Sequence, residues 1–118
     1  MRILTTILIT LSIATLFADS PDWVGDPGAY QFTATISGGI VLNIAGEQMG
    51  DEGDMFGAFD IDGNVRGLGL MLFPPFGPYQ DTPVFEVQLR SNNAGDILYL
   101  KYYDASEDAI LDFKLFFV

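Results

Sequence analysis

The sequence predicts an all-β protein, folded as an antiparallel β-sandwich of about seven strands. Short segments that alternate apolar and polar residues recur through residues 30–118, as expected for half-buried strands. Clusters of Gly, Asn, Asp and Pro separate these segments, and no stretch has the 3.6-residue apolar spacing of an amphipathic helix. Apolar residues make up 49% of the 118-residue chain, which is ample for the core of one domain.

Seven segments are expected to be strands: 30–36, 40–45, 55–61, 65–73, 83–91, 96–103 and 109–118. Gly38-Gly39 ends the first segment and Gly46 ends the second. Asp62-Gly63-Asn64 favours the positive φ angles of a hairpin turn between the third and fourth. A proline-rich loop at 74–79, a turn at 92–95 and a loop at 104–108 separate the remaining segments.

Two strands carry further expectations. Gly67 and Gly69 lie on one face of the fourth strand, where a bulky neighbour can pack closely. The seventh strand ends the chain on a β-prone apolar run, which the domain's own core or another subunit must cover. Seven strands in about ninety residues match the size of an immunoglobulin-like sandwich. The Cys-Trp-Cys pattern of true immunoglobulin domains is absent, so only the architecture is predicted.

The composition excludes several classes of function. Sixteen acidic residues against five basic ones give a net charge of −11, so nucleic acid is not an expected partner. Without cysteine or histidine the chain has no disulfide, no zinc or haem site and no Ser-His-Asp triad. No nucleophile–base pair can be assembled, and we therefore expect a protein that is not an enzyme.

Residues 1–17 support two readings. One is a secretory signal peptide, with Arg2, an apolar run and cleavage after Ala18. The other is a β-strand arm, in which one face carries Ile7, Ile9, Leu11 and Ile13. Leu16 stands where a signal peptidase prefers a small residue, which favours the strand. The segment is too short and too rich in hydroxyl groups for a membrane span, so no membrane span is expected in the mature protein.

Residues 18–29 read as a linker, and residues 30–118 as the β-sandwich domain. The linker contains two prolines, two glycines and three aspartates. Its twelve residues span at most ~40 Å when extended, enough to reach another molecule. Its single aromatic residue, Trp23, is expected to cover the edge of the core.

Two acidic loops are candidates for a calcium site. The predicted ligands are Asp51, Asp54, Asp104, Glu107 and Asp108. Like charges this close need a counterion or full solvation, and oxygen-only ligands suit Ca²⁺ better than other metals. The alternative is that both loops are simply solvated. No other cofactor is expected.

Several motifs carry a resemblance to a known class of protein: 53–59 (GDMFGAF), 65–67 (VRG), 84–85 (VF) and 98–105 (LYLKYYDA). Over residues 30–112 this pattern resembles β-sandwich modules of secreted bacterial proteins, whose function is largely unknown. Together with the N-terminal arm, the layout looks like that of subunits of extracellular fibrils that assemble by donor-strand exchange. The resemblance implies an immunoglobulin-like sandwich completed by a strand from another subunit.

The expected function is that of a structural subunit of an extracellular or cell-surface filament, with other copies of the same chain as its partner. Burial of the arm's four apolar side chains alone does not outweigh the conformational entropy of ordering it, so the arm should insert between two strands. The alternative is a monomeric secreted module that binds carbohydrate or calcium, with residues 1–18 removed on export.

Overall fold

The computed structural model describes residues 20–117, with side chains described as far as Phe113. The predicted arm residues Ile7, Ile9, Leu11 and Ile13 lie outside the described residues. Within the described part the protein is all-β, as predicted, and its one short helix is the 3₁₀ turn η1 (Pro27–Ala29). No helix among residues 20–117 is long and apolar enough to cross a membrane.

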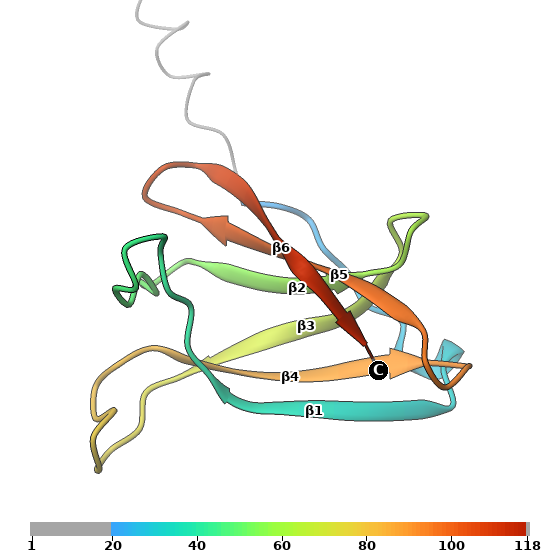
Figure 1. The fold of residues 1–118 in the computed structure, drawn as a ribbon, viewed down its shortest axis with the longest axis horizontal. Coiled ribbons are helices and arrows are strands. Elements are labelled where there is room, and N and C mark those ends of the chain that lie inside the picture. Colours follow the sequence, from blue (N-terminus) through green and yellow to red (C-terminus); the bar gives the residue numbers. More distant parts are fainter. Residues whose placement is uncertain (1–19, 118) are drawn as a thin grey trace, which may run out of the picture.

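Six antiparallel strands form one sheet in the order β1-β4-β3-β2-β5-β6 (Figure 1). The strands are β1 (Phe32–Gly39), β2 (Met55–Phe59), β3 (Val65–Leu72), β4 (Val84–Ser91), β5 (Ile97–Asp104) and β6 (Ala109–Phe117). Each of the six coincides with a segment that the sequence predicts to be a strand, to within a few residues. Among the described strands, β1 and β6 form the two edges of the sheet.

The predicted hairpin turn after β2 is confirmed. Gly63 has a φ of 86°, and its N–H donates to the carbonyl oxygen of Asp60 at 3.1 Å. The N–H of Asp60 in turn donates to the carbonyl oxygen of Asn64 at 3.0 Å. The positive φ is readily adopted only by glycine, so the turn forms where the sequence places Gly63.

The predicted strand at 40–45 is wrong. In its place the chain makes a tight turn, where the N–H of Gly46 donates to the carbonyl oxygen of Asn43 at 2.9 Å. An isolated bridge between Leu42 and Gln48, with backbone hydrogen bonds from Asn43 to Glu47 and from Met49 to Val41, gives residues 41–49 the form of a small hairpin. Gly38, with a φ of 71°, turns the chain away from the sheet at the end of β1, so residues 40–45 do not extend the ladder with β4.

The sheet curls so that one face is concave and encloses the core. The rings of Phe85 in β4 and Tyr102 in β5 lie 5.8 Å apart edge to face, although β3 and β2 separate their strands in the sheet. Phe56 in β2 and Phe113 in β6 are also 5.8 Å apart, across β5. Figure 1 shows β6 crossing in front of β2 and β3. The remaining core residues are Val41, Ala58, Val87, Leu89 and Leu98.

The two glycines of β3 lie where neighbouring residues pack closely, as the sequence predicts, and this close packing allows the curvature. A Cβ atom on Gly67 would lie 2.5 Å from the backbone oxygen of Gln88 in β4. A Cβ on Gly69 would lie 2.9 Å from the Cβ of Phe56 and 3.1 Å from the ring of Phe85. Since these three distances are all shorter than van der Waals contact, a larger residue at either position would push β3 away from its neighbours.

We expect Gly67→Ala to lower the free energy of unfolding by about 1–3 kcal/mol, because the obstructing atom belongs to the backbone and cannot rotate away. The matched control is Gly28→Ala, where the nearest atom is a side-chain oxygen of Asp26 at 3.8 Å. This control should change the stability by no more than about 0.5 kcal/mol. Urea denaturation of both variants tests the expectation, and equal stabilities would contradict it.

Candidate functional site

The concave face leaves an open apolar groove between the two edge strands. One part of the groove has a volume of about 480 Å³. Its lining includes Ile36 of β1, Leu42, Phe56 of β2, Phe85 of β4, Leu100 of β5 and Phe113 of β6. The lining therefore comes from both edges and from the strands between them.

A second part, of about 640 Å³, continues the groove past the hairpin 41–49. Leu42, Ile44 and Met49 form the hairpin wall, and Leu111 and Phe113 form the wall on β6. The two parts are continuous because Leu42 and Phe113 line both. Leu42 is 53% exposed, Leu111 41% and Phe113 36%, so large apolar side chains here face solvent. We call these two parts together the groove.

Strand alternation decides which β6 side chains face the groove. Leu111 pairs with Tyr102, and both side chains lie on the concave face. Asp112 pairs with Lys101, and both lie on the other face. Ile110, next to Leu111, therefore faces away from the groove together with Asp112. The described β6 face toward the groove is apolar, whereas the other face carries an exposed ion pair between Lys101 and Asp112 at 3.5 Å.

The groove can hold an extended peptide. Its apolar lining can take up alternate side chains of such a peptide. Each edge strand also has backbone N–H and C=O groups that point away from the sheet and can pair with an added strand.

The linker leaves the domain from the face opposite the groove. Trp23 packs edge to face on Phe59, with ring centroids 5.0 Å apart. A Cβ on Gly57 would lie 3.0 Å from the Trp23 ring. Because neighbouring residues in a strand point to opposite faces, Gly57 and Phe59 lie on the convex face while Phe56 faces the groove. Trp23 therefore covers the convex side of β2.

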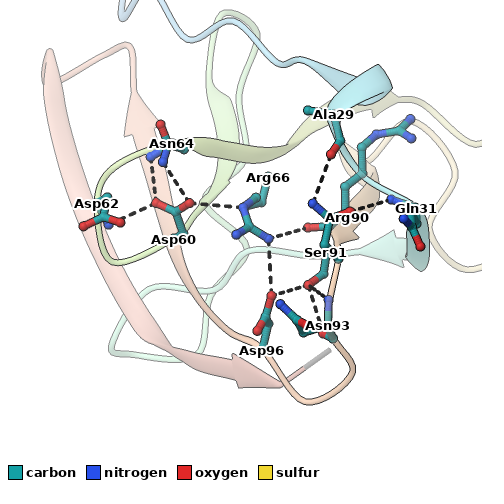
Figure 2. Close-up of polar contacts among 11 residues, drawn as sticks. Ala29, Gln31, Asp60, Asp62, Asn64, Arg66, Arg90, Ser91, Asn93 and Asp96 are labelled. Atoms are coloured by element: carbon teal, nitrogen blue, oxygen red, sulfur yellow. Dashed lines mark hydrogen bonds and ion pairs between the residues drawn. The ribbon is translucent and has the colours of Figure 1, made fainter.

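A polar network around Arg66 fastens the linker to one end of the sheet. The Arg66 guanidinium lies 4.4 Å from the ring centroid of Tyr30, the residue that directly follows the linker. Its Nε donates to Asp60 at 3.1 Å, and its Nη1 lies 3.5 Å from Asp96 (Figure 2). Asp96 also accepts a hydrogen bond from the hydroxyl of Ser91 (Figure 2). Arg66 thereby connects the linker with two turns of the sheet.

Asp60 is held in its charged form by this network. Burial alone would raise the pKa of Asp60, because it removes water from the carboxylate. The side-chain and backbone hydrogen bonds from Asn64, together with those from Arg66 and the backbone of Asp62, outweigh burial. The pKa of Asp60 therefore lies below its ordinary value of 3.8.

The two acidic loops meet through Asp54, which lies buried at 7% exposure. One carboxylate oxygen of Asp54 accepts from the backbone N–H of Ala105 at 2.8 Å. The other accepts from the N–H of Asp51 at 2.9 Å and from the hydroxyl of Tyr102. Burial, the hydrogen bond to Asp54 and nearby carboxylates all raise the pKa of Tyr102, so this hydroxyl stays protonated as a donor.

Of the other predicted calcium ligands, Asp51, Asp104 and Asp108 have local partners, and Glu107 is exposed. Asp104 accepts from the hydroxyl of Ser106 at 2.7 Å, and Asp108 accepts from the hydroxyl of Tyr103 at 2.7 Å. Within residues 20–117 no three acidic side chains are arranged as a metal site. The calcium site stays a prediction.

Sequence reasoning missed the hydrogen bond from the Tyr102 hydroxyl to Asp54, because nothing in the spacing marks residues 48 positions apart as partners.

Comparison of the chain with protein-family models, with curated proteins and with solved structures found no match. The resemblance to secreted β-sandwich modules and fibril subunits therefore stays a prediction from the sequence.

The network around Arg66 predicts a pH dependence of stability. Because folding lowers the pKa of Asp60, its charged form stabilises the folded state fully above the unfolded pKa near 3.8. That contribution is lost as the pH falls through the lower, folded pKa. Above about pH 5, Asp60→Asn should be less stable than the wild type by about 1–2 kcal/mol.

Urea denaturation between about pH 3 and pH 7 measures this difference, which should shrink toward the acid end. Asp62→Asn, an exposed neighbour two residues away, is the matched control and should show a small difference at every pH. A loss for Asp60→Asn that is independent of pH would contradict the assignment.

Proposed function

We propose that this chain is a structural subunit of an extracellular filament. In this proposal the N-terminal strand of one copy inserts into the groove of the next and completes a β-sandwich between the two copies. The observation that carries the proposal is the apolar groove that lies between the two free edge strands of one curled sheet.

The position of the groove meets the energetic requirement of such an insertion. Ordering an extended segment costs conformational entropy that apolar burial alone does not offset. A strand seated between β1 and β6 would add hydrogen bonds to an edge on each side. An addition to a single edge would provide half as many. The groove supports insertion because it is apolar and both edges border it.

The pattern of residues 1–17 suits this groove. Ile7, Ile9, Leu11 and Ile13 would form one apolar row, and a strand from Ile7 to Ile13 is about 20 Å long. The alternate residues Thr6, Leu8, Thr10, Ser12 and Ala14 would face away from the groove, and apart from Leu8 they are small or carry a hydroxyl group. One face of such a strand therefore matches the apolar lining and the other is compatible with solvent.

The course of the linker favours an arm that enters another copy. Trp23 and Tyr30 anchor the linker on the convex face and at the Arg66 network, whereas the groove lies on the concave face. An arm entering its own groove would have to pass around an edge of the sheet within the nine residues between Ile13 and Trp23. A neighbouring subunit does not impose this detour.

The chemistry of the groove supports a binding role. Among the described residues, the part between the edges is lined by aliphatic and aromatic side chains alone. Asn43 and Asp112 border the second part, and the Asp112 side chain pairs with Lys101 on the other face of the sheet. Such a lining can bury apolar side chains but offers no pair of groups for proton transfer or nucleophilic attack. We therefore assign the chain a structural role and no enzymatic one.

Deletion of residues 1–17 should abolish assembly, because the acceptor groove would have no strand to receive. Negative-stain electron microscopy of the full chain should show filaments, while the truncated chain should stay monomeric by light scattering. The folded domain should survive the deletion, with an unchanged circular dichroism spectrum. Normal filaments from the truncated chain, or filaments whose subunits begin near Asp19, would contradict the proposal.

A charge placed in the groove should also block assembly. Leu111→Asp puts a carboxylate where an apolar side chain would be buried, so the critical concentration for assembly should rise by about tenfold or more. Ile110→Asp is the matched control, since Ile110 is 52% exposed and faces away from the groove. Equal critical concentrations for the two variants, measured by sedimentation, would count against the groove as the acceptor.

A further inference from the structure

We infer that the inserted strand has a fixed direction: it runs antiparallel to β1 and parallel to β6, with its N-terminal end at the acidic end of the sheet. This inference rests on the proposed function and goes beyond it, because either direction would complete the sandwich. The charges at the two ends of the sheet distinguish the two directions.

The antiparallel topology gathers the loops at two ends. At one end lie the segment 40–54, the loop 73–83 and the turn 105–108, next to the end of β1 and the start of β6. We call this the acidic end. At the opposite end lie the turn 60–64, the turn 92–96 and η1, toward which the linker runs (Figure 1).

The two ends differ strongly in charge. The acidic end carries eight acidic residues and no lysine or arginine: Glu47, Asp51, Glu52, Asp54, Asp81, Asp104, Glu107 and Asp108. The opposite end carries five acidic residues and two arginines: Asp22, Asp26, Asp60, Asp62, Asp96, Arg66 and Arg90. Its arginines have partners already, since Arg66 binds Asp60 and Arg90 donates to Gln88 at 2.6 Å.

The inserted segment has the complementary charge. Residues 1–17 contain no acidic residue and one basic residue, Arg2. With Ile7 to Ile13 in the groove, Arg2 would extend about 17 Å beyond Ile7 and reach the loops at one end. At the acidic end it meets eight carboxylates and no basic side chain, whereas at the opposite end it meets five carboxylates and two arginines. The attraction of Arg2 is therefore stronger at the acidic end.

Repulsion between subunits acts in the same sense. The body of the donor copy follows residue 17 and carries all sixteen acidic residues of its chain. With the N-terminal end of the arm at the acidic end of the acceptor, the donor body lies next to the opposite end, where the net negative charge is smaller. The reverse direction would bring it against eight acidic residues.

Cross-linking between copies tests the direction, and a chain without cysteine gives no background. Thr33 and Ser37 on β1 are exposed and about 13 Å apart, with Ser37 nearer the acidic end. Donor copies carry Thr6→Cys or Ala14→Cys, and acceptor copies carry Thr33→Cys or Ser37→Cys. Copies are mixed pairwise before assembly and treated with a flexible bismaleimide.

The expected result is that Thr6→Cys links mainly to Ser37→Cys and that Ala14→Cys links mainly to Thr33→Cys. Arg2→Glu should weaken this preference by about fivefold, the largest effect of one exposed ion pair, and 1 M salt should weaken it through screening. The opposite pairing, no preference, or filaments without any of these cross-links would overturn the inference and leave the filament proposal standing. If the wild-type chain, which has no cysteine, formed no filaments, that result would instead contradict the filament proposal itself.

Discussion

One constraint shapes this structure: a single sheet must enclose its own core. The contact of Phe85 with Tyr102 is the result of that constraint. In the described chain no helix or second layer covers the concave face, so the sheet curls until strands that are not neighbours touch. Gly67 and Gly69 make that curvature sterically feasible, because β3 lies at the centre of the sheet. The hairpin 41–49 adds Val41 to the core from above the end of β1. The groove results from this curl, because β6 does not pair with β1 and the apolar space between them stays open.

The strands were predictable from the sequence because each has a local cause. Alternation in β4 places Val87 and Leu89 in the core and Glu86 and Gln88 outside, and this pattern can be read without the structure. The hairpin turn at Gly63 follows from its positive φ in the same way. The prediction of a strand at 40–45 was wrong because the apolar residues there resemble a strand, whereas Gly38 and the turn at Asn43–Gly46 direct the chain away from the sheet. Turn geometry there outweighed β propensity.

Long-range features of the site were less predictable. The acidic loops were recognised from local composition, but the carboxylate of Asp54 turned out to join them by hydrogen bonds to Ala105 and Tyr102. Such a bond depends on how β2 and β5 pair, which no local pattern specifies. The groove is likewise a property of the strand order, since residues from β1 and β6 line it together only after the sheet has formed. The alternation of residues 1–17 suggested a donor strand, whereas the groove proposed as its acceptor is evident only in the three-dimensional arrangement.

The separation of linker and groove onto opposite faces has a consequence for symmetry. If the arm of each copy enters the next, the contact joins two different surfaces and is heterologous. A contact of this kind leaves one unfilled groove at one terminus of an assembly and one unused arm at the other, so growth has a polarity. The proposed insertion would therefore form an open chain of subunits and no closed two-fold dimer, whose contact would need the same surface on both partners.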